Sequence, residues 1–104
     1  MPKQPCIYIL ASNKNGTLYI GVTSDLSKRV WEHKQDVHPG FTRRYQVHRL
    51  VCVEQAPDML SAIAREKQLK IWNRQWKIGL SEAANPHWQD LSHPPLGATD
   101  HLLD

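Results

Sequence analysis

The sequence contains few cysteines and no long apolar run. Its two cysteines, Cys6 and Cys52, stand in separate apolar segments and show no CxxC spacing. This arrangement argues against a disulfide framework or a zinc site and favours buried, reduced thiols. No stretch approaches the roughly 18 apolar residues that cross a bilayer, and residues 1–11 lack the apolar region and the cleavage site of a signal peptide. We therefore expect a cytoplasmic protein that does not enter a membrane.

The net charge of the chain is small as well. Thirteen Lys and Arg residues stand against ten Asp and Glu residues, which gives a net charge of only +3. The pI near 9.0 is compatible with a polyanionic partner, but net charge alone decides nothing. The distribution is more informative, because Lys and Arg recur through the middle of the chain whereas residues 90–104 contain none.

The length of the chain fits one compact domain. With 104 residues, 40% of them hydrophobic, it can bury a single modest core. We expect a monomeric domain over residues 1–91. Residues 92–104 contain two prolines and a glycine and are expected to form a loosely ordered tail.

The start of the chain predicts a β-hairpin. Two short runs rich in β-branched and aromatic residues, 6–11 (CIYILA) and 17–22 (TLYIGV), are joined by SNKNG, whose Asn and Gly suit a tight turn. Side chains alternate along each strand, so an even number of residues in the connection would place Tyr8 and Tyr19 on the same face. Two phenols would then share one surface.

The segment 24–35 predicts a helix, for which Ser24 or Asp25 can supply the cap. Leu26 and Val30 give this helix an apolar stripe. Arg29 and His33 stand four residues apart on a neighbouring face and should therefore be adjacent in space.

The remaining elements follow after a break in the pattern. Residues 37–46 contain Pro39 and Gly40 and lack helical periodicity, which predicts a loop before a third strand at about 49–55. Pro57 and Asp58 then begin a second helix. Its helical spacing is carried by Leu60, Ile63, Ala64, Lys67 and Ile71, with Ala62, Glu66, Lys70 and Asn73 on an adjoining face.

A further helix is expected over 76–84, closing at Asn85 and Pro86. The predicted order is β, β, α, β, α, α. This order indicates an α/β fold of the α+β kind, with a small, mainly antiparallel three-stranded sheet flanked by helices.

Five polar residues on these elements could carry chemistry: Tyr8, Tyr19, Arg29, His33 and Glu66. Hydrolysis of a phosphodiester needs a cation to offset developing charge, a base for the attacking water, and a guanidinium to hold phosphate oxygens. The chain has a candidate for each part. Whether the five side chains converge is a question for the structure.

The spacing of two tripeptides makes the pattern specific. CIY at 6–8 and YIG at 19–21 leave ten residues between the two tyrosines, and T-S-D-L-x-K-R-x-x-E-H follows at 23–33. This series, together with the later Glu in AREK at 64–67, resembles the GIY-YIG nuclease family. The later part of the chain is similar to the short, stand-alone bacterial members of that family. Cys6 occupies the position where the family has glycine, and a small thiol can replace it if the backbone there does not need a positive φ.

The resemblance implies a metal-dependent endonuclease acting on nucleic acid, with DNA favoured over RNA. Tyr8 and Tyr19 would lie beside the scissile phosphate and the metal-bound water that attacks it. Tyr8 is the preferred base. Arg29 would hold the phosphate and stabilise the tyrosinate, and His33 would polarise a tyrosine or relay its proton. Glu66 would be the single protein carboxylate on a Mg²⁺ or Mn²⁺ ion.

Nucleic-acid contacts are expected from basic residues near this site and from one asparagine. Arg43 and Arg44, beside Phe41 and Tyr45, suit a basic loop that tracks phosphates and stacks on bases. The full set of expected contacts is Lys28, Arg43, Arg44, Lys70 and Asn85. For the asparagine that many family members place after the glutamate, Asn85 is preferred to Asn73.

Ordinary roles are open for the same residues. Arg29 could pair with Asp25 or Glu32 on a solvated helix, and Glu66 could pair with Lys70 for only ~0.2–0.5 kcal/mol. The four tryptophans, Trp31, Trp72, Trp76 and Trp88, fit core or core-edge positions better than base stacking. The alternative functions are a nucleic-acid-binding module without catalysis and, behind it, a protein-interaction domain.

Overall fold

The predicted hairpin forms the centre of the fold in a computed structural model, which describes residues 4–36 and 40–92. The expected tail therefore lies outside the described residues, apart from Ser92. The elements in chain order are β1 (Cys6–Ala11), β2 (Leu18–Thr23), α1 (Leu26–Lys34), α2 (Phe41–Arg44), β3 (Arg49–Gln55), α3 (Met59–Ile71) and α4 (Arg74–Ala84).

The three strands form one antiparallel sheet, as the sequence predicts, and their order in the sheet is β2-β1-β3. The central strand β1 is buried along its whole length. In the register between β1 and β2, Tyr8 lies opposite Gly21 and Leu10 lies opposite Tyr19. Tyr8 and Tyr19 consequently occupy the same face, with their ring centroids 6.3 Å apart. The prediction that two phenols share a surface is confirmed.

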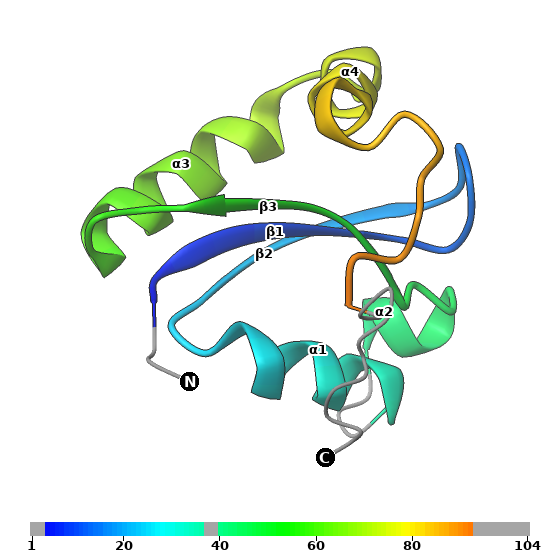
Figure 1. The fold of residues 1–104 in the computed structure, drawn as a ribbon, viewed down its shortest axis with the longest axis horizontal. Helices are drawn as coiled ribbons and strands as arrows, with labels where there is room; N and C mark the ends of the chain where they lie inside the picture. Colours follow the sequence, from blue (N-terminus) through cyan, green and yellow to red (C-terminus); the bar gives the residue numbers. More distant parts are fainter. Residues whose placement is uncertain (1–3, 37–39, 93–104) are drawn as a thin grey trace.

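Helices cover both faces of the sheet, so the molecule has three layers (Figure 1). On one side α3 and α4 pack over Ile7, Ile9 and Ala11 of β1. On the other side α1 and α2 lie over the face that carries Tyr8 and Leu10. The alternation of side chains along β1 thus divides the core into two apolar clusters, and the tyrosines belong to the α1 side.

Side-chain caps explain where α1 and α3 begin. Asp25 accepts a hydrogen bond from the Lys28 amide at 3.3 Å, so it is the cap of α1 in place of Ser24. Asp58 caps α3 by accepting from the Ser61 amide at 2.7 Å. These bonds satisfy amides that have no partner within the first turn.

The expected loop before the third strand contains a short helix, so the loop prediction is wrong over residues 41–44. Gly40 begins this helix at a φ of 141°, a backbone conformation that favours glycine. The amide of Val47 then bonds the carbonyl of Thr42 at 2.8 Å and ends the turn. Four residues are too few to display a helical period, which is why the pattern missed α2.

The buried face of α3 is not the one that carries the helical spacing in the sequence. Leu60 is 81% exposed and Ile71 is 85% exposed, whereas Ala62 and Leu69 are buried against the sheet. Apolar residues stand on both sides of this helix, so spacing alone did not single out the inner face. The small Ala62 side chain lets the helix approach the sheet closely, which selects the face that also carries Glu66.

The tryptophans divide into two groups. Trp88 is fully buried and Trp72 is half-buried, as expected of core and core-edge residues. Trp31 and Trp76 are 58% and 59% exposed, so the core prediction is wrong for these two. The last helix begins at Arg74, two residues earlier than predicted, because Asn73 caps it by accepting from the Trp76 amide at 2.9 Å.

The described residues contain two free thiols and no helix long and apolar enough to cross a membrane. Cys6 is buried at the start of β1 and Cys52 is half-buried on β3. Burial raises the pKa of both thiols, in the case of Cys52 to about 11. Cys6 has no positive φ, so its side chain fits the strand where the family has glycine.

Candidate active site

Tyr8 is the innermost residue of a hydrogen-bonded chain that links β1, α1 and α2. Its hydroxyl lies 3.0 Å from Nε2 of His33, and Nδ1 of the same ring lies 3.0 Å from Oγ1 of Thr42. Tyr8 is only 1% exposed and Thr42 is 8% exposed. Since both ring nitrogens have partners, the orientation of the imidazole is fixed from two sides.

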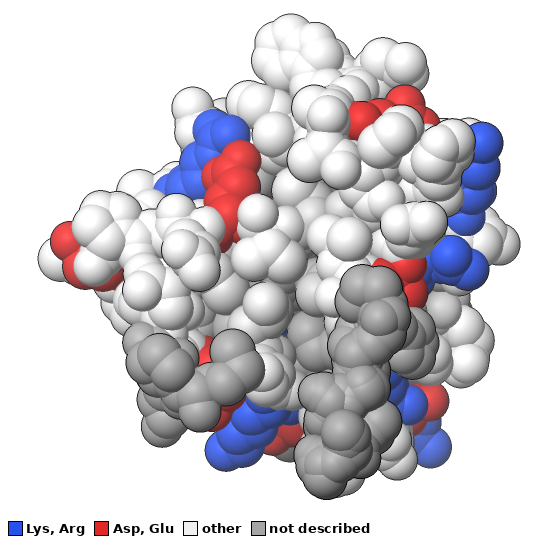
Figure 2. All heavy atoms as spheres, in the orientation of Figure 1, with Lys and Arg blue, Asp and Glu red and all other residues white. Residues whose placement is uncertain are grey.

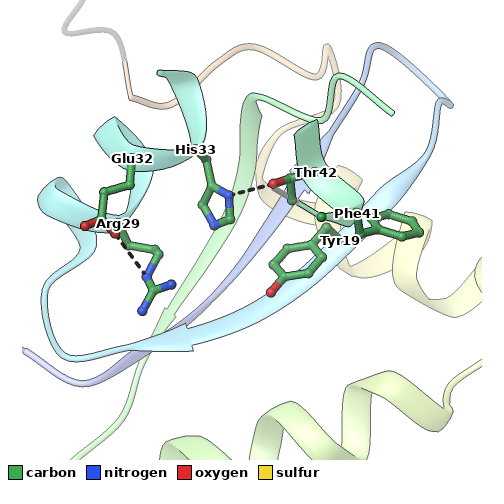
Figure 3. Close-up of a pocket in the computed structure, with 7 residues that line it drawn as sticks. Tyr19, Arg29, Glu32, His33, Phe41 and Thr42 are labelled. Atoms are coloured by element: carbon green, nitrogen blue, oxygen red, sulfur yellow. Dashed lines mark hydrogen bonds and ion pairs between the residues drawn. The ribbon is translucent and has the colours of Figure 1, made fainter. Parts of the chain in front are cut away.

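A pocket of about 170 Å³ opens beside this chain, between α1, α2 and β2. In Figure 3 the side chains of Arg29 and His33 extend from α1 into the space beside the ring of Tyr19, which belongs to β2. The pocket is lined by Tyr19, Arg29, Glu32, His33, Gly40, Phe41 and Thr42. Tyr8 lies behind this wall, because its hydroxyl is covered by His33.

Arg29 is the cation of the pocket. Its Nε lies 3.8 Å from Oε1 of Glu32, three residues along α1, and 43% of the Arg29 side chain is exposed (Figure 3). This is the helical pairing that the sequence left open, with Glu32 as the partner and Asp25 occupied as the helix cap. An exposed pair of this kind is worth little, so the guanidinium can exchange Glu32 for a phosphate at small cost.

Glu66 approaches the site from the other layer of the molecule. It stands on α3, half-buried, with 15% of its side chain exposed, and its Oε2 lies 3.0 Å from Nζ of Lys70. The negative charge on Glu66 and the positive charge on Arg29 both act on the phenol of Tyr8. Glu66 therefore stands within electrostatic reach of Tyr8 even though it does not line the pocket.

The pKa of the Tyr8 phenol is raised well above its usual range. Burial is the largest cause, followed by the neighbouring phenol of Tyr19, while Arg29 acts in the opposite direction. Arg29 thus favours the tyrosinate, as expected from the resemblance, but burial outweighs it. Tyr8 is a neutral phenol at neutral pH in the folded chain.

Gly21 is a residue of the site whose role the sequence did not reveal. A Cβ built on Gly21 would lie 2.4 Å from both Cζ and Oη of Tyr8. The Tyr8 ring therefore crosses directly over the backbone of β2, and only glycine leaves room for it. Its place opposite Tyr8 in a paired hairpin is the signal that could have predicted this contact.

Thr42, Phe41 and Glu32 are further pocket residues that sequence reasoning did not assign to the site. Thr42 and Phe41 stand on α2, which the pattern interpreted as a loop, and no motif distinguishes Thr42. The sequence predicts Glu32 only as an ion-pair partner of Arg29. Its position three residues after Arg29 on one helix could have placed it at the pocket.

The expected nucleic-acid contacts are basic residues at the surface. Lys28 is exposed on α1, Arg43 and Arg44 are exposed on α2, and Lys70 is exposed on α3. The guanidinium of Arg44 lies 5.6 Å from the ring centroid of Tyr45. On the described part of the face in Figure 2, Lys and Arg lie in separate groups, with Asp or Glu beside several of them.

Asn85 is not available for nucleic acid, which corrects the sequence-based expectation. It is 5% exposed, and its Nδ2 donates to the carbonyls of Val51 and Gln89 at 3.2 and 2.8 Å. Its Oδ1 accepts from the amide of Gln89 at 3.0 Å. Asn85 ties the end of α4 to β3, and Asn73 is the N-cap of the same helix.

The donor set suits a hard divalent cation that keeps most of its water. The described residues hold no group of three or more His, Cys, Asp and Glu side chains that could cage an ion. A single carboxylate such as Glu66 is a sufficient protein ligand for Mg²⁺ or Mn²⁺ bound mainly through water and phosphate. The residues present therefore fit such an ion at Glu66.

The chain is similar to known proteins in sequence and in fold. A family model for the GIY-YIG catalytic domain matches residues 4–79. The chain is 32% identical over 74 residues to the UPF0213 protein SSP2268 of Staphylococcus saprophyticus. The aligned segment covers 71% of this chain and 89% of that protein. The solution NMR structure of the UPF0213 protein BH0048 from Bacillus halodurans aligns with a TM-score of 0.52 and 26% identity, over 84% of this chain and 92% of that one. The resemblance inferred from the two tripeptides is confirmed, and the chain belongs to the GIY-YIG family.

Proposed function

We propose that this protein is a metal-dependent endonuclease that hydrolyses phosphodiester bonds in nucleic acid, with DNA as the expected substrate. One observation carries the proposal. A buried phenol, Tyr8, is hydrogen bonded to His33 beside a pocket that contains Arg29, while the carboxylate of Glu66 stands within electrostatic reach. Phosphodiester hydrolysis needs a base, a phosphate-binding cation and a metal ligand, and these residues supply one of each.

Arg29 is proposed to bind the scissile phosphate. It is the only Lys or Arg among the described residues that line the pocket, and its planar guanidinium can hold two phosphate oxygens at once. Tyr19, which faces the same space, would donate its hydroxyl to a third oxygen. The bond between Arg29 and Glu32 gives way when the phosphate enters, because a phosphate offers the guanidinium more acceptor oxygens.

Tyr8 and His33 are proposed to move the proton of the attacking water. With the imidazole proton on Nδ1 and donated to Thr42, Nε2 accepts the hydrogen bond from Tyr8. Because burial keeps Tyr8 in its phenol form, it can take a proton from water only as it passes its own proton to Nε2 of His33. His33 is then the final acceptor in this step, and Tyr8, which is buried in the free protein, would become the relay once the water reaches its hydroxyl.

Glu66 is proposed to hold the divalent ion. When bound, the ion supplies positive charge that offsets the charge developing on the phosphate. Lys70 neutralises Glu66 in the absence of an ion, and it would turn from this carboxylate to the nucleic-acid backbone when the ion binds. Lys28, Arg43 and Arg44 are proposed as further backbone contacts, since they are exposed around the pocket elements.

Cleavage of end-labelled oligonucleotides tests the proposal. Single-stranded, duplex and branched DNA, with RNA of the same sequence, are incubated with the protein in Mg²⁺, Mn²⁺ or EDTA. Glu66→Gln and Tyr8→Phe are expected to lower the cleavage rate by roughly 10²-fold or more. Glu54→Gln is the matched control, because Glu54 is also half-buried and paired with a cation, Arg65, but is not among the charges that act on Tyr8.

The second candidate is a nucleic-acid-binding module without catalysis on the same fold. It is favoured by the burial of Tyr8 and by the two ion pairs that occupy Arg29 and Glu66. The same experiment separates the candidates. Binding that weakens with salt, together with absence of cleavage in both metals by the unaltered protein, would establish the binding module and exclude the endonuclease.

A further inference from the structure

We propose that an aromatic row formed by half-buried Tyr19 and exposed Phe41 and Tyr45 is a base-stacking subsite for an unpaired nucleotide next to the scissile phosphate. The inference rests on the proposed function and specifies its substrate class as a strand with at least one base outside a duplex. The argument depends on three observations: the row, the groove beside it, and the cations around both.

The row runs outward from the pocket. The ring centroids of Tyr19 and Phe41 are 6.1 Å apart, and those of Phe41 and Tyr45 are 4.8 Å apart. Phe41 and Tyr45 are each 46% exposed, although apolar rings of this size are usually withdrawn from water. These two rings therefore offer aromatic surface to solvent at the rim of the pocket.

A second groove, of about 300 Å³, adjoins the pocket along β2. It is lined by Leu18, Tyr19, Ile20, Phe41, Lys70 and Lys77. Tyr19 and Phe41 line the pocket as well, so these two rings form a wall shared by both spaces. A strand whose phosphate lies against Arg29 in the pocket would have its neighbouring nucleotide at this wall.

Four cations belong to the groove or to the helix that carries Phe41. Lys70 and Lys77 line the groove, and Arg43 and Arg44 belong to the same short helix as Phe41. Aromatic faces interleaved with cations are the combination that binds single strands, because the bases stack while the phosphates are neutralised. A purely apolar partner would not account for the four cations.

Stacking on these rings requires a base whose own face is uncovered. In a duplex both faces of each internal base are covered by neighbouring base pairs, whereas a base in a single strand, flap or loop can turn outward. The row therefore favours substrates in which the nucleotide beside the cut is unpaired. It contributes affinity for any of the bases, since each has a π-face.

Three oligonucleotides of equal length test the subsite in EDTA, where no cleavage occurs: a single strand, the corresponding duplex, and a strand of abasic nucleotides. The unaltered protein is expected to bind the single strand more tightly than the abasic strand. Phe41→Ala should weaken binding of the single strand by roughly 5- to 100-fold and leave binding of the abasic strand unchanged. Phe41→Trp should retain the preference, because it keeps an aromatic face.

Trp31→Ala is the matched control. Trp31 is an exposed aromatic residue that lines a different cavity, next to Leu26 and Leu91, so its removal should leave the preference intact. Circular dichroism of each variant verifies the fold. Equal effects of Phe41→Ala on the single and abasic strands, or none on either, would overturn the subsite.

Cleavage of the same oligonucleotides in Mn²⁺ separates the two proposals. If Phe41 governs the binding of single strands but no strand is ever cut, the subsite stands and the endonuclease proposal fails. If cleavage depends on Glu66 but Phe41→Ala cuts single strands and duplexes in the original ratio, the endonuclease stands and the subsite fails. A protein that binds none of the strands contradicts both.

Discussion

The hydroxyl of Tyr8 and Nε2 of His33 lie 3.0 Å apart, across 25 positions of sequence. This bond joins the central strand of the sheet to the helix that carries Arg29. It places the imidazole between a buried phenol and the wall of an open pocket. The proton transfer that we propose therefore depends on how tightly this bond is held and on the state of the phenol.

Tyr8 should ionise only at a pH above that at which an exposed phenol ionises. Burial raises its pKa in the folded protein above the value of about 10 for an exposed phenol. An unfolded chain would release this proton first, so the contribution of Tyr8 to stability is complete below about pH 10 and falls as the pH rises further. In a spectrophotometric titration, one of the three tyrosines should ionise only as the fold is lost, and Tyr8→Phe should remove this step. Three ionisations near pH 10 in a protein with native circular dichroism would contradict the assignment.

Thr42 should act as a positioning residue for His33. Thr42→Val keeps the buried volume but removes the hydroxyl that meets Nδ1. The loss of one hydrogen bond of about 0.5–1.5 kcal/mol corresponds to a roughly 2- to 10-fold lower kcat, with KM little changed. Thr42→Ser should restore kcat, because it returns the hydroxyl. A loss of kcat of the same size in both variants would point to a general loss of structure instead.

Gly21 and Gly79 form a matched pair for testing stability. Gly21→Ala would place a Cβ 2.4 Å from the ring of Tyr8, which should lower the free energy of unfolding by about 1–3 kcal/mol. Gly79 lies within α4, and a Cβ there meets nothing within 4 Å. Gly79→Ala should therefore stabilise the protein by about 0.5–1 kcal/mol. Urea unfolding measures both changes, and opposite signs are the expected result.

Asp90 should stabilise the fold at neutral pH and lose this effect in acid. Its carboxylate accepts bonds from Lys34 at 2.5 Å and from the Ser92 hydroxyl at 2.6 Å. Burial alone would raise its pKa, but these hydrogen bonds outweigh burial and hold the pKa below the usual range. Because the folded pKa is lowered, the stabilisation is present above about pH 4 and disappears as the pH falls through the folded value.

Asp90→Asn checks this behaviour. At pH 7 the free energy of unfolding of the variant should be about 1–3 kcal/mol lower than that of the unaltered protein. This difference should shrink as the pH is lowered below 4. Urea unfolding at a series of pH values provides the measurement. A difference that stays constant down to pH 2 would show that Asp90 acts by shape and not by charge.

Part of the fold could be predicted from the sequence because it depends on local pattern. Alternation along two short strands placed Tyr8 and Tyr19 on one face, and a four-residue spacing placed Arg29 beside His33. The strand β3 and the start of α3 at Asp58 follow from β-propensity and capping chemistry. These features involve residues close in sequence, so no knowledge of tertiary packing was needed.

The remaining features depend on contacts between distant segments. Thr42 enters the site only because Gly40 turns the chain into a four-residue helix that meets His33. Ala62 and Leu69 form the inner face of α3 because they pack against the sheet. The helical spacing in the sequence runs instead through Leu60 and Ile71, which are exposed. The proximity of Glu66 to Tyr8 could be inferred from the family resemblance and not from any periodicity.

The burial of β1 on both faces ties the proposed base to the most protected part of the molecule. Backbone amides in a central strand exchange with solvent only when the whole domain opens, so we expect the Tyr8 amide to exchange among the slowest. Phe41, by contrast, stands on a one-turn helix at the surface. The proposed proton relay thus belongs to the buried sheet and the proposed stacking rim to a surface helix, so fitting a new strand shape would require changes in α2 without disturbing the sheet.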